Sequence, residues 1–371
     1  MDRCMSNKRR AVGLLASSLI ALVVGEWASR VVFHKNVEQL RFSGSDRYYY
    51  YDREGYRRHI PKSVGYERMW NDQGKAEFRI NSFGFRGPEL SERKAPGTVR
   101  IVFLGDSITL GGRLPEEATF VSRVGKALNS GGSSRYEIVN AGAGDVGLAE
   151  EEETLKGQVF RLQPDAVVLC WYLNDARPPV GFPEEVVYNH WFIRWINVHP
   201  IFRRSYLVGA VYDGVRKSLV ARQMVYDRRF DWIEPYKTGA WATDVGAFVS
   251  VVHSARFDWG DAWSDASLSR MAEKLKGLRD ASEARGIRFL VVAMPLQAQV
   301  YARFSSPLTT KPQDEMGTFA RKNSIKMLDL LPVLKKRAGE LLFYDQCHYT
   351  PRGNEIVAKA ISDFLRREEV E

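Results

Sequence analysis

The chain has 371 residues, 44% of them hydrophobic and 27% charged, which suits one large folded domain with additions or two domains and excludes global disorder. Its formal net charge of +9 indicates an anionic neighbour, which can be a membrane surface, an acidic polysaccharide or nucleic acid. The basic residues are not accompanied by a zinc-binding, RRM-like or helix-turn-helix signature, so nucleic acid ranks last and we expect no nucleic-acid partner.

Residues 1–33 have the composition of a membrane-targeting segment. A basic cluster at residues 8–10 precedes fifteen uncharged positions, residues 11–25. A helix needs ~20 residues to cross a bilayer, so this segment is long enough only if the helix continues to its end. Glu26 and Arg30 must then pair as i, i+4 neighbours near the outer interface. The basic residues before the span place the N-terminus in the cytoplasm.

A cleaved signal peptide is the competing interpretation of the same residues. The uncharged run fits its hydrophobic region, and Val23-x-Gly25 offers a small-residue cleavage site. We favour an uncleaved anchor, because no Ala-x-Ala site occurs and the apolar pattern continues past this position. Either way the chain from residue 34 onward is exported. We expect a single-pass protein of a bacterial inner membrane that faces the periplasm, or a secreted protein after cleavage.

Residues 34–98 form a pre-domain collar in our interpretation. Four consecutive tyrosines stand at residues 48–51, and a charged stretch follows them. A strand-like run at residues 76–80 then leads into residues 81–88. Arg86 in that last segment can bind a substrate, but a structural clamp to the following domain is the expected role.

A buried strand is predicted at residues 101–104, because four apolar residues rich in β-branched and aromatic types run into Gly105-Asp106-Ser107. The strand stops sharply there, and a tight turn or helix start begins at Ser107. At the carboxyl end of a strand in an open α/β sheet, Ser107 presents its hydroxyl where such folds bind ligands. Its backbone N–H is free to polarise a substrate oxygen.

Further strands are predicted at intervals along the rest of the chain. They lie at residues 136–139, 166–171, 287–293 and 325–328, with helices at 119–128 and 268–284 and a last, structural helix at 355–366. Strands that alternate with helices predict right-handed crossovers and a parallel sheet covered on both faces. The first two of these strands lead into loops of their own, Asn140-Ala141-Gly142-Ala143-Gly144-Asp145 and Tyr172-Leu173-Asn174-Asp175.

An insertion at about residues 176–264 interrupts this alternation. It contains six of the nine tryptophans: Trp191, Trp195, Trp232, Trp241, Trp259 and Trp263. Part of it is basic and amphipathic, with Val208, Val211, Val215 and Leu219 on one helical face. Its tryptophans and arginines can clamp sugar rings, or the helix can lie on a membrane surface. The third interpretation is a helical cap that packs on the sheet with its charges facing water.

Asp345 and His348 are three residues apart near the C-terminus, a spacing that lets the carboxylate fold back onto the imidazole. Such a contact fixes the tautomer of the ring and stabilises the imidazolium that forms when a serine gives up its proton. Cys347, between them, is interpreted as a packing residue. Together with Cys4 and Cys170 it makes no disulfide framework. The histidines show no metal spacing, so we expect no metal and no other cofactor.

The order of four blocks, around Ser107, Gly144, Asn174 and Asp345-x-x-His348, resembles the SGNH, or GDSL-type, hydrolases in an exported, membrane-anchored form. The resemblance extends from about residue 79 to the C-terminus. It implies a flavodoxin-like three-layer α/β/α fold with a central parallel sheet, in a hydrolase domain at residues 99–371 that carries the insertion.

The resemblance also implies roles for the residues of the four blocks. Ser107, His348 and Asp345 correspond to the catalytic triad. The oxyanion hole is expected to comprise the N–H groups of Ser107 and Gly144 and the side-chain amide of Asn174, with Gly142 as the alternative to Gly144. The sequence departs from the family pattern at Tyr172, which stands where a glycine is usual and puts the local backbone shape in doubt.

A serine with these partners attacks acyl carbonyls and passes through an acyl-enzyme. We therefore expect a serine esterase that removes acyl groups from an extracytoplasmic carbohydrate polymer or a lipid ester. An O-acetyltransferase that hands the acyl group to a polysaccharide has the same residues and stays open. A non-catalytic scaffold or glycan-binding member of an export assembly is the third hypothesis, and the intact set of reactive residues argues against it.

Overall fold

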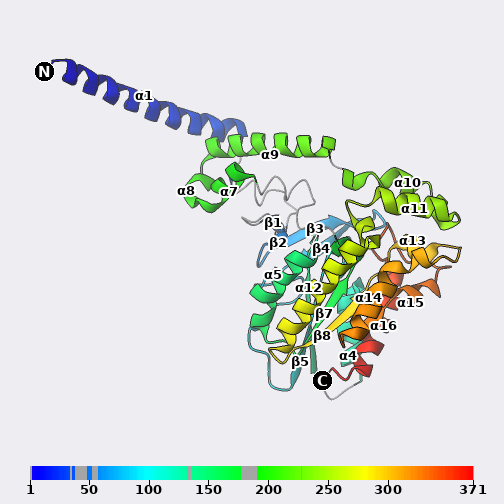
Figure 1. Ribbon diagram of the computed structural model, residues 1–371. Helices are drawn as coiled ribbons and strands as arrows, with labels where there is room; N and C mark the ends of the chain where they lie inside the picture. Colours follow the sequence, from blue (N-terminus) through cyan, green and yellow to red (C-terminus); the bar gives the residue numbers. More distant parts are fainter. Residues whose placement is uncertain are drawn as a thin grey trace. The chain divides into compact units, whose positions relative to one another are not determined.

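The computed structural model describes residues 2–33, 36–37, 48–51, 57–131, 135–144, 146–176, 190–226 and 228–370. The chain divides into two compact units. A helical unit comprises residues 1–44, 50–55 and 183–226, and a sheet unit comprises residues 45–49, 56–182 and 227–371. The two units are described separately, and Figure 1 gives their elements.

A five-stranded parallel sheet forms the centre of the sheet unit. Its strands are β5 (Thr98–Gly105), β6 (Arg135–Gly142), β7 (Ala166–Trp171), β8 (Arg288–Ala293) and β9 (Lys326–Asp329), in the spatial order β6-β5-β7-β8-β9. Each predicted strand is present. The interior strands β5 and β7 are buried along their whole length, as their unbroken apolar runs predict for a sheet covered on both faces.

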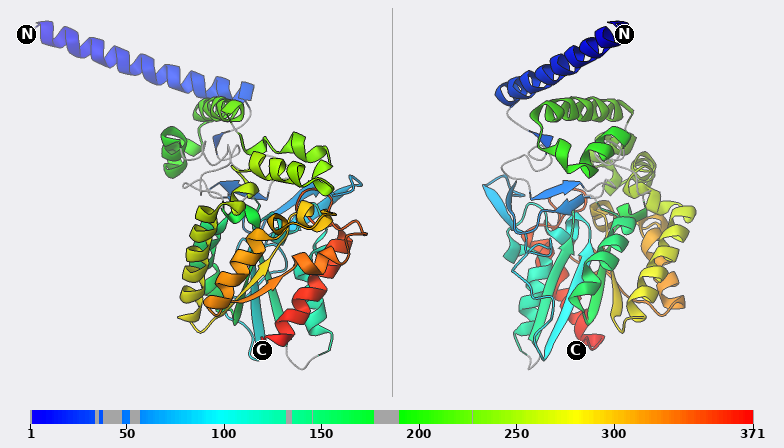
Figure 2. Two further views of the ribbon diagram at one scale, coloured as in Figure 1. Left: turned by 45° about the vertical axis from the view of Figure 1, so that its right-hand side comes forward. Right: turned by 90° about the vertical axis from the view of Figure 1, so that its left-hand side faces the viewer.

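Helices cover both faces of the sheet, as Figure 2 shows. One layer contains α4 (Phe120–Asn129) and α16 (Pro351–Arg367), which pack against each other, and the other contains α5 (Leu148–Gly157), α12 (Asp265–Glu283) and α14 (Lys311–Lys322). The predicted three-layer α/β/α fold is therefore confirmed. The last helix begins at Pro351 rather than at residue 355, because Thr350 Oγ1 accepts a hydrogen bond from Gly353 N–H and proline suits the first helical position.

The remaining elements of the sheet unit are short. They are β1 (Tyr49–Tyr51), which begins in this unit, β2 (Arg57–His59), β3 (Val64–Arg68), β4 (Lys75–Arg79), α3 (Ser107–Leu110), α10 (Ile233–Lys237), α11 (Val245–Ser254), α13 (Gln297–Tyr301) and α15 (Leu331–Lys335). Single turns of 3₁₀ helix lie at Glu116–Ala118, Val159–Leu162, Leu173–Ala176, Arg228–Phe230, Ala240–Ala242, Trp259–Trp263 and Pro307–Thr309.

Arg86 ties the collar to the loop that follows α3. Its guanidinium donates to the carbonyl oxygens of Leu110 at 2.8 Å, Gly111 at 2.8 Å and Leu114 at 2.6 Å, and it lies over the ring of Phe78. The side chain is buried, and burial lowers its pKa to about 10. Arg86 is thus a structural clamp, as expected, because both of its Nη groups donate to backbone carbonyls.

The tryptophans of the insertion differ in burial, and Trp263 is partly buried against the core of the sheet unit. Trp232, Trp241 and Trp259 are buried in the sheet unit, where the Trp232 and Trp259 rings meet edge to face, so these side chains form a packed cap rather than exposed sugar platforms. Trp191 and Trp195, in the helical unit, are exposed.

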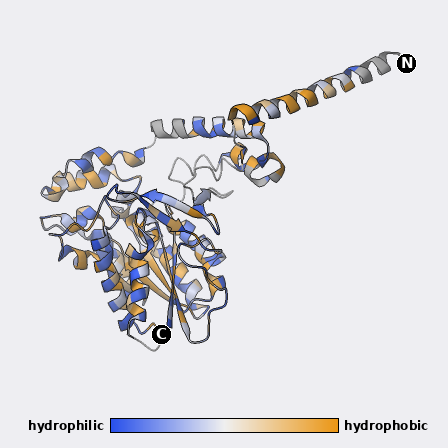
Figure 3. Ribbon diagram, turned by 180° about the vertical axis from the view of Figure 1, so that it is seen from behind, coloured by the Kyte–Doolittle hydropathy of each residue, from blue (hydrophilic) through white to orange (hydrophobic). Residues whose placement is uncertain are grey.

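The helical unit comprises α1 (Asp2–Phe33), α7 (Trp191–Val198), α8 (Pro200–Arg203) and α9 (Tyr206–Tyr226). By length and composition the Val12–Phe33 part of α1 can cross a membrane, a property that a signal sequence shares, and Figure 3 shows its hydrophobic character. The predicted pair is present, with Arg30 Nε 3.4 Å from Glu26 Oε1.

Candidate active site

Ser107 is placed by the abrupt end of β5. A Cβ on Gly105, the last residue of the strand, would lie 2.2 Å from Thr109 Oγ1, so only glycine lets the chain turn this tightly. Asp106 is extended and its carboxylate accepts a hydrogen bond from Ile108 N–H at 2.8 Å, which starts α3 at the serine. The N–H of Ser107 belongs to the first turn of that helix, where the helical ladder supplies no acceptor.

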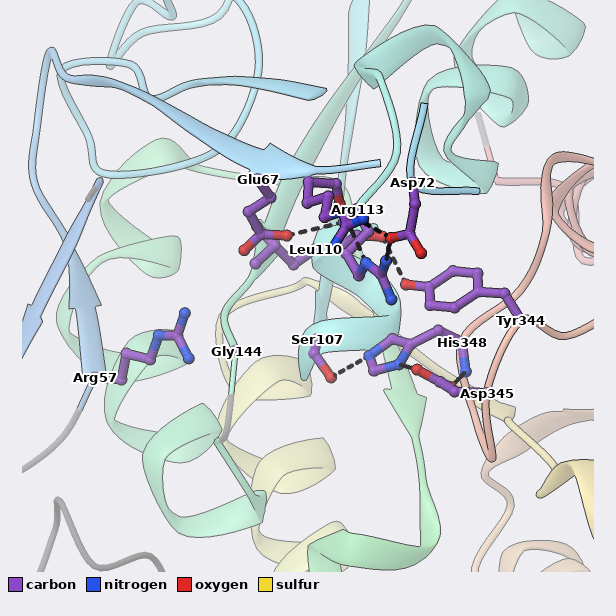
Figure 4. Close-up of a pocket in the computed structure, with 12 residues that line it drawn as sticks. Arg57, Glu67, Asp72, Ser107, Leu110, Arg113, Gly144, Tyr344, Asp345 and His348 are labelled. Carbon is purple, nitrogen blue, oxygen red and sulfur yellow. Dashed lines mark hydrogen bonds and ion pairs between the residues drawn. The ribbon is translucent and has the colours of Figure 1, made fainter. Parts of the chain in front are cut away.

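His348 and Asp345 complete a hydrogen-bonded chain with Ser107, shown in Figure 4. Ser107 Oγ lies 2.8 Å from His348 Nε2, and His348 Nδ1 lies 2.8 Å from Asp345 Oδ2. The other oxygen of Asp345 accepts hydrogen bonds from the backbone N–H groups of His348 at 2.8 Å and Cys347 at 3.0 Å. The carboxylate is therefore held in place from two sides, and it orients the imidazole toward the serine.

Within the Ser107–His348–Asp345 hydrogen-bonded chain, His348 and Asp345 stabilise each other's charged forms. Burial by itself would raise the pKa of Asp345, but the His348 ring and the two backbone N–H groups outweigh it and lower that pKa below its usual value. Burial would likewise lower the pKa of His348, but its interactions with Cys347 and Asp345 outweigh burial and raise that pKa well above 6.5. The imidazolium form is therefore favoured by its neighbours.

Cys347 contributes packing at this point rather than a reactive thiolate. Its Sγ lies 3.4 Å from His348 Nδ1, and one donor atom each of Asp345, Cys347 and His348 lie within 4.8 Å of one another. Burial raises the pKa of the Cys347 thiol to about 12. Because a metal ligand or nucleophile must be a thiolate, this cysteine is suited to neither role at neutral pH.

The end of β6 and the loop after it contain two glycines, and these lie in different surroundings. A Cβ on Gly142 would lie 2.3 Å from the backbone nitrogen of Leu110, so Gly142 is needed for the close approach of β6 to α3. Gly144 lines the same pocket as Ser107 and His348, and the guanidinium of Arg57 covers it. Of the two glycines expected here, Gly144 is the one that faces the pocket.

The loop after β7 brings Asn174 to the serine-bearing turn. Asn174 Nδ2 donates to Asp106 Oδ2 at 3.2 Å. Tyr172, which replaces the usual glycine, is buried, and its N–H donates to Asp175 Oδ2 at 3.0 Å. It is not among the described residues with a positive φ, so the backbone requires no glycine there.

A pocket of about 480 Å³ opens beside the reactive serine (Figure 4). Its lining comprises Arg57, Glu67, Arg68, Asp72, Ser107, Leu110, Gly112, Arg113, Gly144, Tyr344, Asp345 and His348. The sheet order places β5 between β6 and β7, where the direction of winding reverses, and ligands of open α/β sheets bind beside such a point.

Sequence reasoning missed the collar's share of this pocket. The side chains of Arg57, Glu67, Arg68 and Asp72 all line it. The charged stretch that contains most of them predicts only a collar from its sequence. No local pattern marks these residues, because their contacts are long-range. For example, Glu67 accepts a hydrogen bond from the N–H of Arg113 at 2.8 Å.

Arg113 and Tyr344 form the wall of the pocket nearest to His348. Arg113 Nη2 donates to Asp72 Oδ1 at 2.8 Å. The Tyr344 ring stacks on the His348 ring, with centroids 5.5 Å apart, and its hydroxyl donates to the carbonyl of Gly112 at 2.8 Å. The stacked Tyr344 ring covers one face of the imidazole, while the two ring nitrogens bind their partners at its edges.

The fold and the arrangement of these residues agree with those expected of an SGNH hydrolase-like domain. Residues 258–371 match the family model described as SGNH hydrolase-like domain, acetyltransferase AlgX. The matched part contains Asp345 and His348 and lies after the Ser107 block. The resemblance predicted from the four blocks is thereby confirmed.

The solved structures that are similar to the chain include a lipase/acylhydrolase and an acetylxylan esterase. The lipase/acylhydrolase of Enterococcus faecalis is 13% identical with a TM-score of 0.43, and the likeness covers 73% of this chain and 96% of that one. A catalytic mutant of the acetylxylan esterase Axe2 of Geobacillus stearothermophilus is 14% identical with a TM-score of 0.41, over 72% and 93% of the respective chains. Likenesses of this size do not define the activity. No curated protein matches the chain.

Proposed function

We propose that this protein is a serine acyl-transfer enzyme that hydrolyses O-acyl esters, with Ser107 as nucleophile, His348 as general base and Asp345 as its orienting carboxylate. The observation that carries the proposal is the unbroken hydrogen-bonded chain from Ser107 Oγ through the imidazole to Asp345, at the edge of a pocket. A serine hydroxyl has little nucleophilicity without such a base.

In the first half of the reaction, Ser107 Oγ attacks the ester carbonyl carbon while His348 Nε2 takes the hydroxyl proton. The N–H groups of Ser107 and Gly144 and the amide of Asn174 stabilise the oxyanion. The imidazolium then gives its proton to the leaving alcohol. In the second half, water attacks the acyl-serine with His348 again as base, which releases the carboxylic acid and regenerates the serine hydroxyl.

The pocket favours an acylated carbohydrate over a lipid ester. Among its lining residues Leu110 is the only aliphatic one, whereas Arg57, Arg68 and Arg113 face Glu67, Asp72 and Asp345. Hydroxyl-rich rings can use such donors and acceptors. A long acyl chain would find little apolar surface here, so a short acyl group such as acetyl fits best.

An O-acetyltransferase is the second candidate, and the family model favours it, because the model's description names an acetyltransferase. The same acyl-enzyme would then be attacked by a sugar hydroxyl in place of water. We further propose that the protein works outside the cytoplasm, held in a bacterial inner membrane by α1. The apolar Val12–Phe33 segment and the basic residues before it support this location.

The decisive experiment treats the purified full chain with a fluorophosphonate probe and with p-nitrophenyl acetate, and compares it with Ser107→Ala and His348→Ala. Labelling and acetate release should both disappear in either variant. A folded wild-type protein that is neither labelled nor active would overturn the proposal and favour a binding role. Adding an acetylated donor together with an unacetylated polysaccharide separates the two candidates, because a transferase would move acetyl groups to the polymer rather than to water.

A further inference from the structure

The charge-free part of α1 is too short to cross a bilayer. Residues 11–25 form about 22 Å of helix at 1.5 Å per residue, against a hydrocarbon thickness of about 30 Å. Beyond them, Trp27, Val31 and Phe33 are exposed on the helix surface. If lipid covers these side chains, as the hydrophobic effect favours, Glu26 comes to lie at or below the level of the headgroups.

Hydrogen bonds stabilise the Glu26 carboxylate for such a position. Besides the contact with Arg30, its carboxylate accepts hydrogen bonds from Ser205 Oγ at 2.7 Å and from the N–H groups of Tyr206 and Leu207, both at 3.0 Å. A carboxylate with this many donors loses less free energy on leaving water than a bare one. The bonds also fix the first turn of α9 at the depth of Glu26.

The helices just before α9 carry large apolar side chains that stand exposed. In α7, Ile193 and Ile196 are buried, so the inward face of that helix is already filled. Trp191 nevertheless stands 72% exposed on α7, and Ile201 stands 78% exposed on α8. A soluble surface helix would carry polar residues there, and tryptophan is the side chain most typical of a membrane interface.

Basic side chains accompany this apolar surface. Arg194 lies on the exposed side of α7, and Arg204 follows α8 directly. Arginines beside tryptophan and isoleucine are the composition of an element that inserts shallowly and pairs with lipid phosphates.

We propose that α7 and α8 form an interfacial element, which lies in the headgroup region of an anionic phospholipid bilayer at the C-terminal end of the α1 span. Trp191 and Ile201 insert toward the acyl chains, while Arg194 and Arg204 contact lipid phosphates. A membrane is the partner of this surface, because the surface is positively charged and continues from the α1 span. The protein is thereby attached at two points, and α9 is fixed at the bilayer surface.

A spin-label depth measurement on the full chain tests this proposal. The chain carries Cys4→Ser, since Cys170 and Cys347 are buried, and is placed in nanodiscs that contain phosphatidylglycerol. Nitroxides are attached to single cysteines at Ile201 and Trp191, at Val23 as the lipid reference and at the exposed Lys217 on α9 as the water reference. All four positions are exposed, so the labels leave packing undisturbed.

The measured quantity is the ratio of nitroxide collisions with oxygen to collisions with a water-soluble nickel chelate. The ratio at Ile201 and Trp191 should exceed that at Lys217 several-fold and approach that at Val23. Equal ratios at Ile201, Trp191 and Lys217 would overturn the proposal. Nanodiscs of phosphatidylcholine alone should reduce the ratio at Ile201, and an unchanged ratio there would overturn the assignment to anionic lipid. Neither measurement depends on the proposed acyl-transfer activity.

Discussion

Ser107 Oγ lies 2.8 Å from His348 Nε2, although the two residues are 241 positions apart in the chain. The contact therefore depends on how the start of α16 docks beside α4. Asn354 of α16 makes this connection, because its Oδ1 accepts the N–H of Phe120, the first residue of α4, at 2.8 Å. Its Nδ2 donates to the carbonyls of Tyr349 and Thr350.

We expect Asn354→Ala to weaken this docking. The buried N–H of Phe120 would be left without an acceptor, which costs about 1–3 kcal/mol, so the thermal unfolding temperature and the rate of p-nitrophenyl acetate hydrolysis should both fall. Lys359→Ala, at an exposed position of the same helix, is the matched control and should change neither. Unaltered stability in Asn354→Ala would contradict the role given to this side chain.

The pH dependence of the reaction should follow the ionisation of His348. The imidazolium cannot accept the proton of Ser107, so activity is lost as the pH falls through the pKa of His348. Because that pKa is raised, the midpoint of the acidic limb should lie above pH 6.5. Asp345→Asn removes the carboxylate and should move the midpoint downward, with a rate loss of about 10³–10⁴-fold. A pH–rate profile of both proteins checks this, and identical midpoints would disprove the coupling.

Gly142, the last residue of β6, and Gly144, in the loop that follows, should respond differently to substitution by alanine. In Gly142→Ala the new Cβ meets backbone atoms of α3, which cannot move alone. The free energy of unfolding should therefore fall by about 1–3 kcal/mol, and the protein should unfold at a lower temperature. In Gly144→Ala it meets the flexible end of Arg57, 2.7 Å from Nη1. That variant should fold normally and lose activity. The comparison needs thermal unfolding and steady-state kinetics, and a stable Gly142→Ala protein would refute the packing argument.

Asn174→Ala removes the side-chain donor of the proposed oxyanion hole. The loss of one such donor lowers kcat by about 10²–10³-fold, and stopped-flow measurement of acyl-enzyme formation would detect it. Tyr172→Phe is the control from the same loop, since the buried Tyr172 hydroxyl has no hydrogen-bond partner among the described residues and its removal should raise stability slightly. Activity of Asn174→Ala within a few-fold of the wild type would exclude the amide from the oxyanion hole.

The sheet and the residues of the Ser107–His348–Asp345 chain could be predicted from the sequence because the patterns that indicate them are local. A buried parallel strand needs apolar residues on both faces, so β5 and β7 appear as unbroken hydrophobic runs. Ser107 follows one such run, and Asp345 and His348 interact over a single turn. In each case the residues that define the feature are close neighbours in the chain.

The rest depends on contacts between distant residues. Glu67 and Arg113 meet across 46 positions, and Glu26 and Tyr206 across 180. Neither pair follows a periodic pattern, and each partner alone looks like an ordinary surface residue. The charged wall of the pocket and the attachment of α9 to α1 could therefore be found only from the structure.

The pocket is assembled from two stretches of sequence that do not overlap. Four of its charged side chains, Arg57, Glu67, Arg68 and Asp72, precede residue 73, whereas the hydrogen-bonded chain begins at Ser107. In the proposed enzyme, substrate preference and reactivity are thus encoded in separate parts of the chain. Variation confined to residues 57–72 would then change what that enzyme accepts without altering the Ser107–His348–Asp345 chain, which makes this short segment the natural target for engineering of new specificities.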